Sequence, residues 1–164
     1  RPLPIESGQT ISQPFVVALM IESLKLRRTD RVLDVGCGSG YAAAILACLV
    51  DQVYSIECIQ TLATSAERRL QKLGYTNVHV RWGDGSQGWP EHAPYQAIVV
   101  AAAAHEVPHS LKEQMAVGAR LIIPVGSNEQ DQHLLRITRT SESGYHTEDL
   151  GAVRFVPLIG EEGW

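Results

Sequence analysis

The sequence has 164 residues, a formal net charge of −4, 45% hydrophobic residues and 20% charged residues. A chain of this length can bury a sizeable core as one domain, and its negative charge gives no electrostatic reason to expect nucleic acid or an anionic membrane as a partner. Its three cysteines, Cys37, Cys48 and Cys58, lack CxxC spacing. Free thiols of this kind suit a reducing cytoplasm. We expect one cytoplasmic, monomeric domain over residues 1–164.

Short apolar strands alternate with helical patterns along the chain. We expect strands over 31–35, 53–57, 78–82, 97–101, 119–125, 133–140 and 152–156. Helices are predicted over 41–50, 61–73 and 108–115, with Gly74 as a stop signal and Pro108 at a first helical turn. This alternation, with the first strands apolar throughout, predicts an α/β fold with a doubly wound, mostly parallel seven-stranded sheet. Ligands of such sheets bind beyond the carboxyl ends of the strands.

A glycine-rich turn follows the first of these strands. Gly36, Gly38 and Gly40 alternate with other residues in the segment 34–40, which reads DVGCGSG. Alternate glycines remove the Cβ atoms that would keep a ligand away from the backbone, and they permit positive φ angles. The turn therefore indicates a site where a ligand approaches the main chain closely.

Three acidic residues stand at strand ends near this turn. Glu57 ends the next strand, about 20 residues after the first glycine, where a carboxylate can accept hydrogen bonds from both ribose hydroxyls. Asp84, in the segment 83–85 (GDG) after the third strand, is placed to reach an adenine amino group. Asp34 fits the acidic-x-Gly-x-Gly-x-Gly turn of methyltransferases, where it can help orient the cationic methionine end of the cofactor. Together these residues predict a nucleoside-binding site.

A dinucleotide-binding dehydrogenase is the weaker interpretation of the same turn. Its fingerprint, GxGxxG or GxGxxA, begins directly after the strand. Counted from Gly36, the third position is Tyr41, which does not fit; counted from Gly38 it is Ala43, which fits, but the turn then begins late. A tight strand-to-helix turn without a ligand is the other alternative.

The segment His105–His109 matches the zinc-protease pattern HExxH. That pattern binds zinc only on a helix, which places both histidines on one face. Pro108 has no N–H and clashes with the carbonyl four residues earlier, so a helix should begin there instead of passing through. We therefore expect no metal site.

The chain resembles the protein-L-isoaspartate O-methyltransferases, which depend on S-adenosylmethionine. The resemblance rests on motifs that extend from Pro2 to Leu158. They are PLPI (2–5), GQTISQP (8–14), VLDVG (32–36) with GSGY (38–41), YSIE (54–57), GDG (83–85) with Gly88, PVG (124–126) and RFVPL (154–158). The GQTISQP segment near the start of the chain and the RFVPL segment near its end are far more specific to this family than the glycine turn is.

This resemblance implies the Rossmann-like methyltransferase fold and a protein-repair reaction. A methyl group passes from S-adenosyl-L-methionine to the α-carboxylate of an L-isoaspartyl residue in a damaged protein or peptide, leaving S-adenosyl-L-homocysteine. By likeness to the family, Ser12 is the active-site residue, and it also suits a helix N-cap ahead of Pro14. The residues that the likeness places at the cofactor and substrate are Gln9, Thr10, Ile11, Gly36, Ser39, Glu57, Asp84 and Gly85. Isoaspartyl-containing proteins are the expected partners, without nucleic acid or membrane.

The chain departs from the family pattern at several places. Glu6 stands where a glycine is usual, Gln96 replaces an acid before the fourth strand, and Ala101 replaces a common threonine. The N-terminal helical segment of the family is expected to be absent. Two further functions stay open at this point: a methyltransferase of the same fold that acts on another peptide carboxylate, and a non-catalytic S-adenosylmethionine-binding module.

Overall fold

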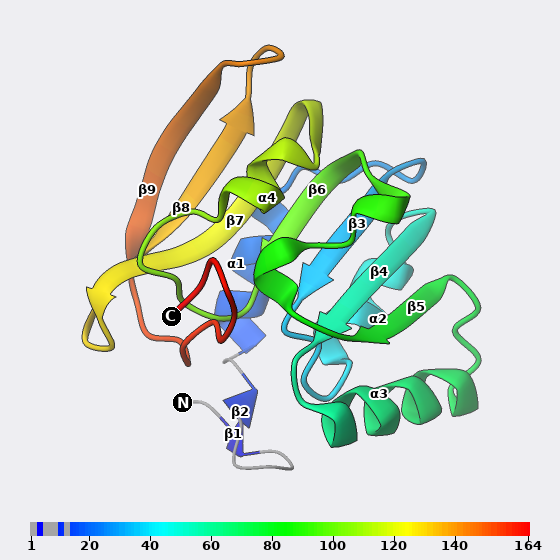
Figure 1. Ribbon diagram of the computed structural model, residues 1–164. Helices are drawn as coiled ribbons and strands as arrows, with labels where there is room; N and C mark the ends of the chain where they lie inside the picture. Colours follow the sequence, from blue (N-terminus) through cyan, green and yellow to red (C-terminus); the bar gives the residue numbers. More distant parts are fainter. Residues whose placement is uncertain (1–2, 5–9, 12–13) are drawn as a thin grey trace.

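A seven-stranded sheet lies at the centre of the computed structural model, which describes residues 3–4, 10–11 and 14–164 (Figure 1). Its strands are β3 (Arg31–Val35), β4 (Gln52–Glu57), β5 (Val78–Trp82), β6 (Tyr95–Val100), β7 (Met115–Asn128), β8 (Asp131–Arg139) and β9 (Tyr145–Val153). They lie in the order β5-β4-β3-β6-β7-β8-β9. The strands from β5 to β7 pair in parallel, and β8 and β9 add antiparallel strands at one edge. The predicted α/β fold with a mostly parallel sheet is confirmed.

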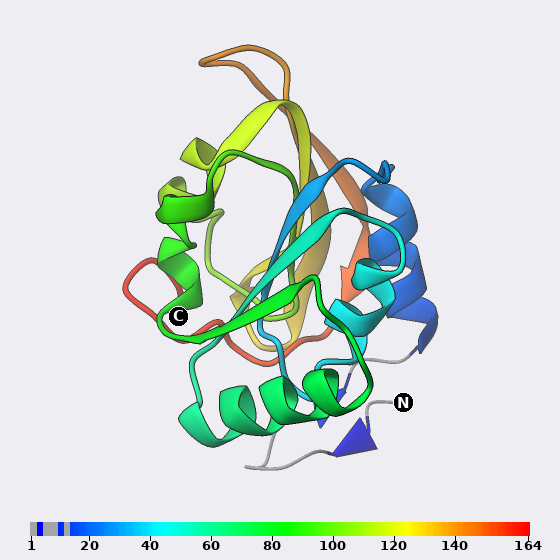
Figure 2. The same ribbon diagram turned by 90° about the vertical axis from the view of Figure 1, so that its right-hand side faces the viewer.

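Helices cover both faces of this sheet (Figure 2). They are α1 (Pro14–Ser23), α2 (Tyr41–Ala47), α3 (Gln60–Lys72), α4 (His109–Glu113) and the 3₁₀ turns η2 (Gly85–Gln87) and η3 (Pro90–His92). On one face Leu46 of α2 and Leu70 of α3 join a core with Val32. On the other face Leu111 of α4 packs with Leu33. A separate two-stranded sheet pairs β1 (Leu3–Pro4) with β2 (Thr10–Ile11).

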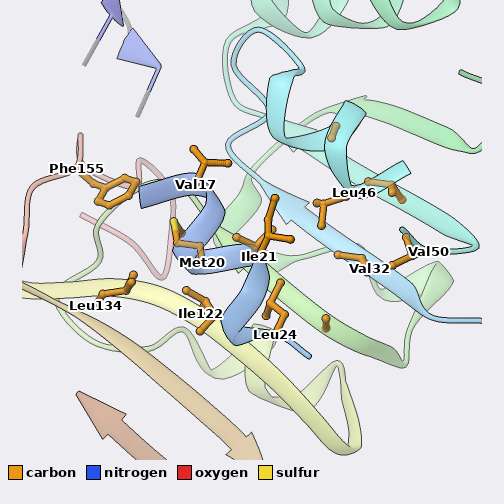
Figure 3. Close-up of a cluster of buried hydrophobic side chains, with 14 of the residues drawn as sticks. Val17, Met20, Ile21, Leu24, Val32, Leu46, Val50, Ile122, Leu134 and Phe155 are labelled. Atoms are coloured by element: carbon orange, nitrogen blue, oxygen red, sulfur yellow. The ribbon is translucent and has the colours of Figure 1, made fainter. Parts of the chain in front are cut away.

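Helix α1 has no counterpart among the predicted elements. Its sequence PFVVALMIES is apolar on nearly every side, so it lacks the one-sided 3.6-residue pattern by which surface helices are recognised. Such a helix is stable only when other elements cover it. Figure 3 shows Met20 and Ile21 of α1 between Leu134 and Ile122 on one side and Leu46 on the other. The helix thus joins the two halves of the sheet on this face.

Truncating Met20 should destabilise the protein strongly, because its side chain is only 2% exposed in this core. We expect Met20→Ala to lower the free energy of unfolding by about 2–5 kcal/mol, from the lost burial and the cavity left behind. Phe15→Ala is the matched control on the same helix, because Phe15 is 75% exposed. Urea denaturation followed by circular dichroism measures both variants. Equal losses for the two would contradict this packing.

The structure corrects several predicted boundaries in the second half of the chain. The helix predicted over 108–115 ends at Glu113, and β7 begins at Met115, four residues before the predicted start at Ala119. The last strand occupies Tyr145–Val153 instead of 152–156. This strand lies at the sheet edge, where most side chains face solvent and no apolar run is needed. Pairing with β8 determines its position.

Among the described residues, no helix combines the length and the apolar character that crossing a membrane requires.

Candidate functional site

A cavity opens at the carboxyl ends of β3, β4 and β6, where the predicted site residues were expected to meet. Four stretches of chain line it: the glycine turn at 36–39, the end of β4 at 56–58, the loop after β6 at 101–102, and the C-terminal stretch 156–159. Val17, Val35, Tyr41, Ala42 and Gly85 complete the lining. The cavity therefore brings together Gly36, Gly38, Ser39, Glu57 and Gly85 from the sequence-predicted set.

The glycine turn has a backbone that other residues rarely adopt. Gly36 and Gly40 both have a φ of 88°, in the left-handed region where a Cβ causes strain. The Gly36 N–H donates to the carbonyl of Ile56 at 2.9 Å, which ties the turn to β4. A Cβ on Gly36 would lie 3.7 Å from Ala101, so the φ angle and not a lack of space requires glycine there.

Glu57 connects the end of β4 to the glycine turn. Its side chain is buried, and its Oε1 accepts a hydrogen bond from the Gly38 N–H at 2.9 Å. Its Oε2 accepts one from the Ile59 N–H at 3.0 Å. A carboxylate oxygen has two acceptor positions, so each oxygen retains capacity for one further donor. Sequence reasoning did not anticipate these backbone contacts, because they depend on how the turn folds back over β4.

Asp34 is buried completely on β3 and does not appear among the described residues that line the cavity. The Ser55 hydroxyl donates to its Oδ2 at 2.8 Å, and no described group donates to its Oδ1. Burial raises the pKa of Asp34 from 3.8 to about 6; the Ser55 hydrogen bond opposes this shift, and the negative charge of Glu57 adds to it. Asp34 is therefore a buried acid directly before the glycine turn.

Cys37, in the glycine turn, is also buried, and burial raises the pKa of its thiol far above the ordinary value. A thiol with a raised pKa is a poor nucleophile at neutral pH. Cys37 therefore contributes an apolar surface to the cavity wall.

Asp84 and Gly85 belong to the segment 83–85, in which Asp84 was predicted to reach the adenine, and the structure gives these two residues different roles. Gly85 lines the cavity, and a Cβ there would lie 2.5 Å from Val35 Cγ1, so only glycine fits. Asp84 is not among the described cavity-lining residues. Its Oδ1 accepts from the Ser86 N–H at 2.9 Å, and its Oδ2 accepts from the Glu161 N–H at 2.9 Å. Asp84 thus joins the η2 turn to the C-terminal segment.

Sequence reasoning assigned no cavity role to the residues after β6 or to the C-terminal stretch 156–159. Ala101 and Ala102 follow a parallel strand, so their place at the cavity agrees with the rule on strand ends. Nothing local in 156–159 indicates a binding role. The stretch reaches the cavity because Ala103 and Pro157 form a parallel bridge between distant parts of the chain.

The proposed active-site segment is only partly described. Ser12 and Gln9 lie outside the described residues, as does Glu6. Thr10 and Ile11 form β2, which pairs with β1.

The HExxH segment does not form the helix that a zinc site needs. Helix α4 begins at His109 with Pro108 at its N-cap, one residue after the predicted start at Pro108, so His105 lies outside the helix. The His105 ring stacks on Trp164 at 4.0 Å between centroids, and His109 pairs with Glu113 at 2.9 Å. The two histidines therefore have different partners.

The sheet is doubly wound in this order, with a glycine turn after its first parallel strand and an acidic residue at the end of the next. These features define a Rossmann-like S-adenosylmethionine-dependent methyltransferase. The model of the protein-L-isoaspartate(D-aspartate) O-methyltransferase family matches residues 1–163. The chain belongs to this family.

Curated relatives and solved structures agree with this assignment. The protein-L-isoaspartate O-methyltransferase 2 of Pelobacter propionicus is 57% identical over all of this chain and 73% of its own length. The enzyme of the same name from Marinobacter nauticus is 58% identical over all of this chain and 75% of its own length. A solved protein-L-isoaspartate O-methyltransferase superposes with a TM-score of 0.88 at 30% identity, covering 96% of this chain, which spans 50% of that protein. A Plasmodium falciparum structure assigned to the same activity, in complex with S-adenosyl-L-homocysteine, has a TM-score of 0.84 at 28% identity, covering 96% of this chain and 79% of that one.

Proposed function

We propose that this chain methylates the α-carboxylate of L-isoaspartyl residues in damaged proteins and peptides, using S-adenosyl-L-methionine and releasing S-adenosyl-L-homocysteine. The observation that carries this proposal is the family match over residues 1–163, in a chain whose cavity lies where the fold binds a nucleoside. The product is a methyl ester, whose collapse to a succinimide and hydrolysis partly restores normal aspartate.

The residues around the cavity fit S-adenosylmethionine. The backbone at Gly36, Gly38 and Ser39 leaves room for close approach, and the carboxylate of Glu57, which lines the cavity, suits the two ribose hydroxyls as a hydrogen-bond acceptor. Gly85 lines the cavity in the loop after β5, where it would contact the adenine ring. Asp84 would complete the adenine end from the adjacent loop.

Two further groups complete the proposed cofactor site. Asp34, directly before the turn, would favour the cationic methionine end through its negative charge. Gln9, Thr10 and Ile11 would line the side on which the cofactor meets the substrate, and Ser12 would stand at the substrate carboxylate.

The chemistry demands little proton transfer from the protein. A carboxylate with an ordinary pKa of about 4 is already ionised at neutral pH, so no general base is needed. S-adenosylmethionine supplies the methyl group: its carbon bonds to the carboxylate oxygen as the sulfur–carbon bond breaks and the electron pair passes to sulfur. The protein contributes placement and the exclusion of water by the apolar wall at 156–159. Ser12 would donate a hydrogen bond that holds the substrate carboxylate without neutralising it.

We also propose that residues 1–164 act as one cytoplasmic, monomeric domain. The three cysteines are free, which suits a reducing compartment. The net charge of −4 does not favour nucleic acid or anionic membranes as partners.

Transfer of a tritiated methyl group to an isoaspartyl peptide, beside its normal aspartyl twin, tests the proposal. Only the isoaspartyl peptide should be labelled. Ser12→Ala should lower the rate of methyl transfer about 10- to 100-fold, which is the effect expected from the loss of one hydrogen bond to a charged group. Ser127→Ala, at an exposed serine on β7, is the control and should retain the rate.

Other outcomes would point to the alternative functions. Labelling of both peptides would indicate a methyltransferase for peptide carboxylates in general. Binding of the cofactor without transfer to either peptide would indicate a binding module. A Ser12→Ala variant with the full wild-type rate would remove Ser12 from the active site.

A further inference from the structure

The C-terminal segment, residues 154–164, forms one wall of the cavity after the chain leaves β9 (orange to red in Figure 1). The Ala103 N–H donates to the Val156 carbonyl at 2.8 Å, and the Leu158 N–H donates to the Ala103 carbonyl at 2.7 Å. These two bonds fix the segment at the loop after β6. They hold Val156 and Leu158 of the wall, residues 156–159, directly, and Ile159 at the end of the wall leads into the part of the segment that is held further along.

Asp84 and Gln87 hold that further part through Glu161. Three more residues hold it through Glu162, and we call them the clasp: Ser86, Ser110 and Glu162. The Glu162 carboxylate accepts from the Ser110 N–H at 2.9 Å and from the Ser110 hydroxyl at 2.7 Å. The Glu162 N–H donates to the Ser86 hydroxyl oxygen at 3.0 Å. Because Ser86 belongs to η2 and Ser110 to α4, the clasp ties two separate elements to the segment.

The close approach at Gly160 supports this arrangement. A Cβ there would lie 2.0 Å from Asp84 Oδ1 and 2.6 Å from the Ser86 hydroxyl oxygen, so the segment approaches η2 at a distance that only glycine allows. The Trp164 N–H donates to the Leu158 carbonyl at 2.6 Å, which closes residues 158–164 into a loop. The wall and the clasp thus belong to one closed unit.

We propose that Glu162 is a positioning residue for the cofactor site, because it holds the wall at 156–159 in the place where it faces the glycine turn. This inference rests on the proposed function, since it takes S-adenosylmethionine as the ligand of the cavity. Glu162 is not among the described residues that line the cavity, so it acts through the wall. The clasp would affect binding of the cofactor and not the chemical step.

Binding of S-adenosyl-L-homocysteine, measured by titration calorimetry on the full protein, provides the primary test. Loss of two hydrogen bonds to a carboxylate should make Glu162→Ala bind about tenfold more weakly. Glu162→Gln should bind within about threefold of wild type, because its amide oxygen can still accept and its NH₂ can donate to the Ser110 hydroxyl. Glu129→Ala is the matched control, because it removes the same charge from an exposed position between β7 and β8, away from the C-terminal segment.

Two further readouts separate positioning from a general loss of stability. KM for S-adenosylmethionine should rise in Glu162→Ala while kcat at saturating cofactor stays within about twofold, because the clasp affects binding alone. Hydrogen exchange at the Leu158 amide should become faster in this variant, while exchange in β3 stays unchanged.

The outcomes distinguish this inference from the proposed function. A wild-type protein that does not bind S-adenosyl-L-homocysteine would overturn both. Tight binding by wild type and equally tight binding by Glu162→Ala would overturn only the role of Glu162. A fall in kcat with KM unchanged would also overturn it, because the clasp would then affect the chemical step.

Discussion

Replacing Asp34 with asparagine should change how the stability of the protein depends on pH. The difference in unfolding free energy, Asp34→Asn minus wild type, is expected to rise by about 2 kcal/mol between pH 4 and pH 8. The reason is that burial raises the pKa of Asp34 to about 6 in the folded protein, from an ordinary value of 3.8. Urea denaturation across this pH range measures the difference.

The sign of this pH dependence follows from which state, folded or unfolded, binds the Asp34 proton more tightly. The folded protein holds the Asp34 proton more tightly than the unfolded chain, so wild-type stability falls as pH rises from about 4 to about 6. Well above pH 6 the full cost of the buried charge is present, and well below pH 4 it is absent. Asparagine never ionises. Any constant effect of the new amide group cancels in the comparison between the two pH values.

Ser55→Ala is a second variant that tests the pKa of Asp34, because the Ser55 hydroxyl stabilises the ionised form of Asp34. Without it the pKa of Asp34 should rise further, so the loss of stability should still begin near pH 4 but become larger and extend to higher pH. In the Asp34→Asn background the Ser55 change should produce no shift with pH. A stability difference that stays constant from pH 4 to pH 8 would show that Asp34 titrates as an ordinary exposed acid.

The Asp34→Asn variant also tests the proposed role of this charge at the cofactor. S-adenosylmethionine carries a positive sulfonium that S-adenosylhomocysteine lacks. Loss of the Asp34 charge should therefore weaken binding of the first more than binding of the second.

Glu57 should be the side chain on which cofactor affinity depends most. We expect Glu57→Ala to weaken S-adenosylhomocysteine binding about 100-fold and Glu57→Gln about tenfold, as expected for hydrogen bonds to a charged group. Alanine removes the proposed ribose acceptors and leaves the N–H groups of Gly38 and Ile59 without their carboxylate. Glutamine keeps the size of the side chain but only one acceptor oxygen. Calorimetric titration gives the affinities.

Glu67→Ala is the control for this experiment, because it removes the same charge from an exposed position on α3. Near-ultraviolet circular dichroism shows whether each variant keeps its fold. A folded Glu57→Ala protein with wild-type affinity would place the ribose elsewhere.

The sheet could be predicted from the sequence because its first strands are buried on both faces. Residues 31–35 and 78–82 form strands with the predicted bounds, and the helices after the first two strands begin within one residue of prediction. In β3 and β4, burial between two layers of helices requires mostly apolar side chains throughout the strand, and that requirement is visible locally, whereas β5 is a half-exposed edge strand. Helix α1 and strand β9 were missed or misplaced because their positions depend on neighbours: α1 is apolar all round, and β9 is an exposed edge.

Part of the candidate site could likewise be predicted from the sequence, and part of it could not. The glycine turn, Glu57 and Gly85 could be placed from the sequence, because each follows a parallel strand and parallel strands end at one edge of the sheet. Only the tertiary structure decided that Asp34 is a buried acid with a raised pKa, that Asp84 bonds to Glu161, and that 156–159 form a wall of the cavity. Burial and contacts between distant segments determine these properties, and no local pattern of residues records them.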